Sequence, residues 1–389
     1  MNDARPVSEN SRGPADYIAS ADAAERLFRE FGNISLLAVD TEAASFHRYH
    51  DRVFLLQIST RSRTAIIDPL AVKELPHLGA VLADRSIEIV FHDADYDLRI
   101  LDRDYGFRAT RLFDTRLAAQ LLNEPGIGLA ALLEKYLGVR LDKRHQRADW
   151  SMRPLTPDML EYAASDTRHL PVLRDLLRER LEALGRWSWA EEEFRLLEGL
   201  RWTPPGPAEE AYLRLKGARA LKGTGLAILR ALYAWREEAA RRLDRATFRV
   251  MSNETLLAIA EASPADVAAL RMIKGISPDV ATRRGQELLA AVRAGLETPP
   301  DSLPVFERSR RSPRDPEFEA AVERLKAVRN SAATRLDLAT GVLCPNGTLE
   351  VIARARPQSL AELAELPGVR RWQVEILGRD LLKAVKGGG

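Results

Sequence analysis

The stretch ISLLAVDTEAASFHRYHDRVFLLQISTRSRTAIID, residues 34–68, contains three short apolar runs that decide the fold of the first half of the chain. These runs, at 34–40, 53–59 and 64–68, are rich in valine, isoleucine and leucine and end in polar residues, as β-strands do. A fourth run of the same kind, IEIVFH, covers 87–92. Three strands this close together, followed by a crossover to a fourth, predict a mixed sheet.

Between and after the predicted strands lie stretches in which apolar residues recur with the helical period. We predict helices over residues 73–84, 95–104, 114–122, 128–137 and 157–183. Strands that alternate with helices indicate an α/β domain, which we place at 14–201. The polar residues 1–13 lack the apolar core of a signal peptide and are predicted to form a disordered tail.

The second half of the chain follows a Pro/Gly breaker, WTPPGPA at 202–208, and has a helical pattern that occurs twice. A shift of 93 positions places RLDRATFRVMSNETL (242–256) on RLDLATGVLCPNGTL (335–349). This internal repeat predicts two copies of one helical domain. We place them at 209–296 and 318–389, joined by a Pro-rich basic linker at 297–317.

The composition limits the classes of function. The chain has 389 residues and a formal net charge of only +2, so any contact with nucleic acid has to come from local basic patches. Its single cysteine, Cys344, excludes an internal disulfide and a cysteine-based zinc site, which fits a cytoplasmic location. No run of residues is long and apolar enough to span a bilayer, so we expect no membrane partner.

Two carboxylates, Asp40 and Glu42, stand at the end of the first predicted strand. The two-residue period of a strand puts both side chains on the same face. Neighbouring carboxylates repel each other unless something positive lies between them, and a divalent cation is the simplest solution. The D-x-E pattern by itself is weak evidence, because the chain has 56 acidic residues.

Two further segments could complete such a site. HDADYD (92–97) follows the fourth strand, at the edge where open α/β sheets place their sites. An acidic helix N-terminus is the alternative interpretation of its first acids. In EYAASDTRHL (161–170), Tyr162 and Asp166 lie one helical turn apart on one face, a spacing that often marks only the edge of a helix.

In order and spacing these segments resemble the exonuclease motifs of the DEDD superfamily: D-T-E after a strand, H-x-x-x-x-D after another, and DW-x-x-RPL followed by YAA-x-D. Because its last motif contains a tyrosine, the chain resembles the branch of this superfamily that contains ribonuclease D. The resemblance covers about residues 34–185, and the helical copies resemble the HRDC domain. One position departs from the pattern, since Asp93 stands after His92 where small residues are usual.

This resemblance implies a ribonuclease-H-like α/β exonuclease domain with a mixed sheet, followed by two all-α HRDC-type domains. It implies a metal-dependent 3′→5′ exoribonuclease that trims RNA with a free 3′ end, tRNA precursors among them. Two divalent cations, Mg²⁺ or Mn²⁺, would be held by Asp40, Glu42, Asp97 and Asp166. Tyr162 would complete the catalytic set by positioning the attacking water, because a tyrosine hydroxyl stays protonated at neutral pH.

Contacts with the substrate are predicted from residue type. The segment LDKRHQRADWSMR (141–153) interleaves basic residues with a tryptophan, a composition suited to phosphates and one stacked base. Packing of the tryptophan beneath the helix is an equal alternative, and Gln57 could instead be a hydrogen-bonding strand residue. The residues that we predict to contact the substrate are Phe46, Gln57, His92, Lys143, Arg147, Trp150 and Arg153.

Two other functions fit the same observations. One is a DNA-directed exonuclease of the same superfamily, since none of the quoted residues reads a 2′-hydroxyl. The other is a non-catalytic scaffold that binds nucleic acid, which the retained cluster of like charges disfavours. A helicase is excluded because the chain has no G-x-x-x-x-G-K-[ST] loop. We further hypothesise that residues 209–389 add electrostatic grip on long RNA, while the chemistry belongs to the first domain.

Overall fold

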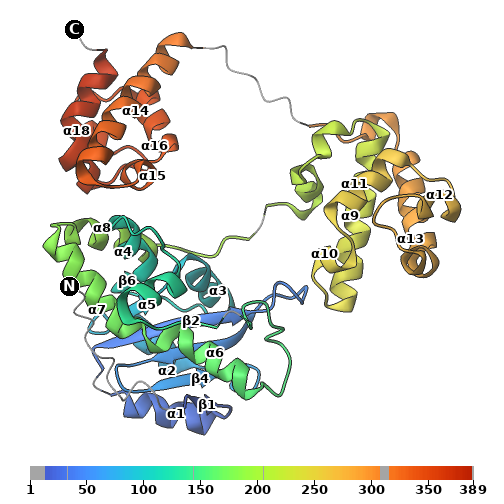
Figure 1. Cartoon of the computed structure of the whole chain (residues 1–389). Helices are drawn as coiled ribbons and strands as arrows, with labels where there is room; N and C mark the ends of the chain where they lie inside the picture. Colours follow the sequence, from blue (N-terminus) through green and yellow to red (C-terminus); the bar gives the residue numbers. More distant parts are fainter. Residues whose placement is uncertain (1–13, 33, 143, 205, 307–314, 388–389) are drawn as a thin grey trace. The chain divides into compact units, whose positions relative to one another are not determined.

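The computed structural model describes residues 14–32, 34–142, 144–204, 206–306 and 315–387 (Figure 1). The chain divides into two compact units. One unit joins the α/β domain to the second helical repeat, and the other joins the first helical repeat to a loop of the α/β domain, Ala43–Arg52. The predicted tail at 1–13 and the linker residues 307–314 lie outside the described residues.

Within the described residues, the α/β domain is built on a six-stranded sheet with the order β1-β4-β3-β2-β5-β6. The strands are β1 (Asp16–Ile18), β2 (Leu36–Ala43), β3 (Val53–Ser59), β4 (Thr64–Ile67), β5 (Glu88–Phe91) and β6 (Leu112–Asp114). Strands β3 and β4 are antiparallel, whereas β1–β4, β2–β5 and β5–β6 pair in parallel. The predicted mixed sheet and its four predicted strands are confirmed, and β1 and β6 are additions of three residues each.

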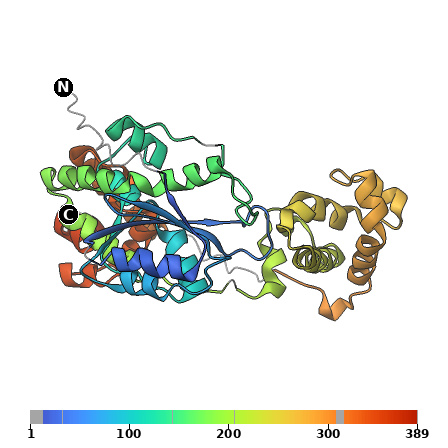
Figure 2. The same cartoon turned by 90° about the horizontal axis from the view of Figure 1, so that it is seen from below.

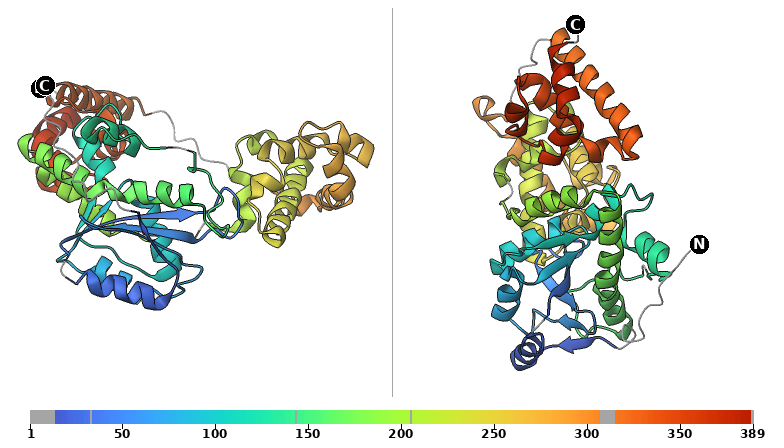
Figure 3. Two further views of the ribbon diagram at one scale, coloured as in Figure 1. Left: turned by 60° about the horizontal axis from the view of Figure 1, so that its bottom comes forward. Right: turned by 90° about the vertical axis from the view of Figure 1, so that its left-hand side faces the viewer.

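Helices cover both faces of this sheet. They are α1 (Ala21–Glu30), α2 (Pro76–Ala83), α3 (Asp95–Tyr105), α4 (Thr115–Leu121), α5 (Leu129–Leu137), α6 (Pro157–Arg168), α7 (Leu170–Ala183) and α8 (Trp187–Glu198). Helix α6 packs on β3 and β4, while α1 and α2 lie on the opposite side of the sheet (Figures 2 and 3). Strand β3 is buried along its whole length between these layers.

The prediction of one continuous helix over 157–183 is wrong. Helix α6 ends at Arg168 and α7 begins at Leu170, with His169 between them. Pro171 is the second residue of α7, and proline has no N–H with which to continue the hydrogen bonds of a preceding helix. The proline therefore ends one helix and starts the next, so α6 and α7 are separate helices.

The two helical repeats contain matching elements in the same order. The first has α9 (Thr224–Leu243), α10 (Thr247–Val250), α11 (Asn253–Ala262), α12 (Val267–Arg271) and α13 (Pro278–Leu296), and the second has α14 (Pro316–Leu336), α15 (Thr340–Leu343), α16 (Asn346–Ala355), α17 (Leu360–Ala364) and α18 (Arg371–Lys386). Helix α14 starts inside the predicted linker, because Asp315 caps it and Pro316 fits its first position.

A buried arginine makes the same contacts in both repeats. Arg236 donates to Asn253 Oδ1 at 2.6 Å and to the carbonyl of Met251 at 3.4 Å. In the second repeat, the counterpart arginine on α14 donates to Asn346 Oδ1 at 2.6 Å and to the Cys344 carbonyl at 3.2 Å. A shift of 93 positions carries each of these residues onto its counterpart, so the predicted repeat is confirmed at the level of buried side chains.

None of the helices in the described part of the chain is long and apolar enough to cross a membrane.

Candidate metal and active site

Three carboxylates from β2 and α6 come together at one point. Asp40 and Glu42 project from the same side of β2, as the strand period predicts, and Asp166 comes down from α6. One carboxylate oxygen of each residue lies within 4.8 Å of the others. All three side chains are half-buried, so their charges are screened less by solvent than those of fully exposed carboxylates. The structure therefore brings together three of the four predicted metal ligands at one point.

Burial and mutual repulsion work against the ionised form of these carboxylates. Burial, and after it repulsion by Asp166, raises the pKa of Asp40 well above its usual range. The pKa of Glu42 is raised by burial and then by Asp40, Asp166 and Asp97. Burial alone raises the pKa of Asp166 to about 7. A cation between these groups would remove the repulsion and favour the ionised form.

The fourth predicted ligand, Asp97, is held by the residue between the other two on the strand. Its Oδ1 accepts hydrogen bonds from the Thr41 backbone N–H at 3.1 Å and from Thr41 Oγ1 at 2.5 Å. Burial and the charge of Asp40 raise the pKa of Asp97. Asp97 thus lies close enough to feel the cluster electrostatically, but it stands outside the group of three whose oxygens meet within 4.8 Å.

The donor set fits a divalent cation of the Mg²⁺ or Mn²⁺ type. Asp40, Glu42, Asp166 and Asp97 offer carboxylate oxygens, which are the ligands that hard cations prefer. Within the described residues, no histidine or cysteine joins the cluster. The chemistry of the donors and the crowding of their charges both agree with metal binding.

Tyr162 lies one helical turn before Asp166 and faces the same cluster. Burial, followed by the charges of Asp166 and Glu42, raises the pKa of Tyr162 far above its usual range, so the hydroxyl stays protonated. Its ring packs against Trp150, with the centroids 5.9 Å apart, and against His145 at 6.0 Å. A cavity of about 320 Å³ is lined by Tyr162 and Asp166 together with basic residues of the neighbouring loop.

The turn after β5 is built around a buried carboxylate that our sequence analysis missed. Asp114 accepts hydrogen bonds from the backbone N–H of Ala94 at 2.8 Å and also caps α4. Asp93 has a φ of 69°, a left-handed conformation that aspartate tolerates better than most residues, and pairs with Arg116. This pairing explains how an aspartate fits the position where small residues are usual.

His92 belongs to the same turn. Its Nδ1 lies 2.9 Å from Thr115 Oγ1, and burial lowers the pKa of His92 to about 4. The imidazole is therefore neutral at physiological pH. The hydrogen bond to Thr115 fixes its orientation.

The structure distributes the predicted substrate residues over very different environments. Trp150 is only 1% exposed and Gln57 is fully buried, with both amide atoms lacking a hydrogen-bond partner among the described residues. Arg153 forms a two-pronged ion pair with Asp68 at 2.6 and 2.7 Å. These placements favour the packing alternative for Trp150 and a structural role for Arg153.

Two other predicted substrate residues, Phe46 and Arg147, are exposed. Phe46 is 44% exposed and packs edge-on against Phe248 of the first helical repeat, with the centroids 5.1 Å apart. Arg147 is exposed beside the loop that lines the cavity. Lys143 lies outside the described residues.

Comparison with known families gives two kinds of match. Residues 16–182 match a family model described as 3′-5′ exonuclease. Residues 225–292 and 318–385 each match the model of the HRDC domain. The two HRDC matches fall on the two helical repeats, and the exonuclease match covers the carboxylate cluster.

Individual relatives cover between three quarters and nearly all of the chain. The ribonuclease D of Gluconacetobacter diazotrophicus is 32% identical over 367 residues, which are 94% of this chain and 90% of the relative. Among solved structures, Escherichia coli RNase D, described as an exoribonuclease involved in structured RNA processing, aligns with a TM-score of 0.70 at 26% identity, over 96% of this chain and 99% of that one. The catalytic core of RRP6 from Trypanosoma brucei aligns with a TM-score of 0.65 at 30% identity, over 76% and 83%.

Proposed function

The chain belongs to the ribonuclease D family and is a 3′→5′ exoribonuclease, and we propose that Asp40, Glu42, Asp97 and Asp166 hold the divalent cations on which its reaction depends. The observation that carries this proposal is the meeting of three half-buried carboxylates within 4.8 Å. Like charges crowded at half-buried positions repel one another unless a cation lies between them, which favours metal binding here. We propose two cations of the Mg²⁺ or Mn²⁺ type.

We propose that the carboxylates act through the cations they hold, and that Thr41 and Tyr162 have separate parts in the hydrolysis of the terminal phosphodiester. When bound, divalent cations at such sites stabilise the charge that develops on the phosphate and lower the pKa of water. Thr41 holds Asp97 in place through two hydrogen bonds, so the fourth carboxylate cannot turn away from the cluster. Tyr162 keeps its proton and can donate a hydrogen bond to the attacking water or to the phosphate.

We propose RNA with a free 3′ end as the substrate, and tRNA precursors as one natural form of it. The description of the E. coli relative as acting in structured RNA processing supports this class. The cavity beside Tyr162 is lined by both basic and acidic side chains, and its Arg144 and Arg168 pair with Asp142 and Glu161, so these arginines would have to exchange a carboxylate for a phosphate in order to contact the substrate. Our prediction of a cytoplasmic location stays a prediction.

A thermal-unfolding experiment tests the metal site without relying on activity. Saturating Mg²⁺ or Mn²⁺, at roughly 100 times its Kd, should stabilise the protein by about 2.7 kcal/mol and raise the Tm by roughly 5 °C. The increase should be larger at pH 8 than at pH 6, because protons compete with the cation for carboxylates whose pKa values are raised, to about 7 for Asp166.

The sign of the pH effect follows from the raised pKa values. Without metal, the folded protein binds protons at this cluster more readily than the unfolded chain does, so the cluster lowers stability as the pH rises toward 7. Asp40→Asn serves as the matched control and should show little gain from the cation. A Tm that does not respond to either cation at pH 8 would contradict the proposed site.

A further inference from the structure

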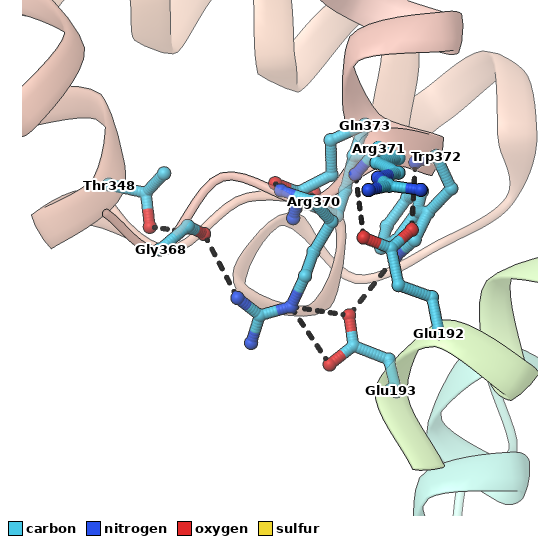
Figure 4. Close-up of polar contacts among 9 residues, drawn as sticks. Glu192, Glu193, Thr348, Gly368, Arg370, Arg371, Trp372 and Gln373 are labelled. Atoms are coloured by element: carbon cyan, nitrogen blue, oxygen red, sulfur yellow. Dashed lines mark hydrogen bonds and ion pairs between the residues drawn. The ribbon is translucent and has the colours of Figure 1, made fainter. Parts of the chain in front are cut away.

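The second helical repeat meets the catalytic domain at the start of α18. Glu192 of α8 accepts hydrogen bonds from the backbone N–H groups of Arg371 at 2.7 Å and Trp372 at 3.1 Å. Its neighbour Glu193 accepts from Arg370 Nε and from Trp372 Nε1, both at 3.0 Å (Figure 4). Figure 4 shows both glutamates pointing from α8 toward the first turn of α18.

The first N–H groups of a helix have no partner inside the helix, and an oxygen of the preceding residue usually caps them. In α18 that preceding residue is Arg370, whose guanidinium has donors and no acceptor. The second repeat therefore cannot cap this helix with its own N-cap side chain. Glu192 supplies the missing acceptor from the catalytic domain, where its negative charge also suits the positive end of the helix dipole.

The first repeat shows that this arrangement is not a requirement of the repeat itself. The 93-residue shift places Ser277, Pro278 and Asp279 where the second repeat has Arg370, Arg371 and Trp372. Ser277 caps its own helix by accepting from the N–H of Val280 at 3.2 Å. Pro278 has no N–H that a carboxylate could bind.

The third of these positions, which is Trp372 in the second repeat and Asp279 in the first, also differs between the two repeats. Trp372 is 2% exposed and stacks on Trp189 of α8, with the ring centroids 4.8 Å apart and the planes 12° from parallel. The matching Asp279 of the first repeat is exposed and pairs with Arg283 on its own helix. A second contact, from Asn123 Nδ2 to Asp337 Oδ1 at 3.0 Å, joins the catalytic domain to the C-terminal end of α14 in the second repeat.

We propose that the second repeat is a brace fixed to the catalytic domain, and that Glu192, Glu193 and Trp189 of α8 form a docking surface built for its Arg370–Trp372 segment. The first repeat has the same fold but has at these positions a self-capped helix and an exposed aspartate. The two repeats thus have different tasks. The face of the second repeat that contains the start of α18 is taken up by the catalytic domain and is closed to RNA.

Hydrogen exchange of the full chain, measured by NMR, tests this proposal. The amides of Arg371 and Trp372 stand in the first turn of a helix, where exchange is fast unless something outside the helix protects them. We expect both amides and the Trp372 indole N–H to be protected in the wild type. Glu192→Ala should speed exchange of the two amides by at least about tenfold. Glu191→Ala, on the same helix, should leave them unchanged.

A second variant keeps the test independent of the glutamate. Trp372→Asp gives the second repeat the residue that the first has at the matching position, and it should release the same two amides while the catalytic domain stays folded by circular dichroism. Fast exchange of Arg371 and Trp372 in the wild type, or full protection in Glu192→Ala, would overturn the proposal. Neither outcome touches the metal site, and activity on short RNA should be the same in Glu192→Ala as in the wild type.

Discussion

Replacing Asp40 with Asn should lower the rate of 3′-end hydrolysis by at least about 10³-fold, because a metal site contributes several kcal/mol of transition-state stabilisation and each 1.36 kcal/mol is a factor of ten. Asp40 is one of the three carboxylates that meet within 4.8 Å. The same substitution removes one of the crowded charges, so the metal-free protein should become more stable. Steady-state trimming of a short single-stranded RNA and thermal unfolding in EDTA measure the two effects.

The opposite signs of these two effects distinguish loss of a metal ligand from loss of the fold. Asp95→Asn is the matched control, because Asp95 lies two residues before Asp97 on α3 but is exposed and pairs only with Arg99 among the ion pairs of the described residues. The Asp95→Asn substitution should change the rate and the stability little, because exposed ion pairs contribute little to stability. Activity of Asp40→Asn within tenfold of the wild type would contradict the assignment.

Replacing Tyr162 with Phe should lower the rate by about 10²–10⁴-fold while cation binding persists. The substitution keeps the ring that packs on Trp150 and removes only the hydroxyl, which burial and the nearby carboxylates keep protonated. The loss should therefore appear in kcat, with the Tm and its increase on Mg²⁺ addition preserved.

Tyr136→Phe is a demanding control for this effect. Tyr136 also donates its hydroxyl to a carboxylate, Glu124 at 2.5 Å, but it stands on α5 outside the carboxylate cluster. Its loss should cost some stability and leave the rate unchanged. If Tyr162→Phe and Tyr136→Phe have the same activity, the hydroxyl of Tyr162 has no part in the reaction.

The parts of the fold that could be predicted are those with a long, regular signal. The strands β2 to β5 have continuous apolar runs, and the 93-residue repeat can be recognised from matching residues in the sequence without knowledge of the helices. Strands β1 and β6 have three residues each, too few for a period to show. The break between α6 and α7 depends on one proline, Pro171, whose effect a periodicity count does not register.

In the candidate site, too, some residues could be predicted from the sequence and others could not. Asp40, Glu42 and Asp166 could be found because each stands in a short motif with fixed spacing. Thr41 and Asp114 support the site through hydrogen bonds to residues 56 and 20 positions away in the chain, and such contacts leave no local pattern. A period of two would even turn Thr41 away from the cluster, although its backbone and hydroxyl hold the fourth carboxylate.

We hypothesise that residues 209–389 grip long RNA, and this role has to be tested for each of the two repeats separately. Removal of the whole helical half would also expose Trp189 and leave Glu192 and Glu193 without partners, so a truncation near residue 205 would confuse loss of grip with loss of the brace. Substitutions of basic residues in the full chain avoid this problem. The slope of log affinity against log salt should then fall by about 0.7 for each lost contact with a single strand.

We propose that divalent cations bound by the carboxylate cluster drive the stepwise trimming of RNA from its 3′ end. The most direct measurement follows a 5′-labelled single-stranded RNA with the full-length protein, in EDTA and across a titration of Mg²⁺ or Mn²⁺. We predict no cleavage in EDTA and, with the cation, a ladder of labelled products that shortens one nucleotide at a time. Cleavage that persists in EDTA, or immediate release of the 5′-labelled mononucleotide from full-length RNA, would contradict it.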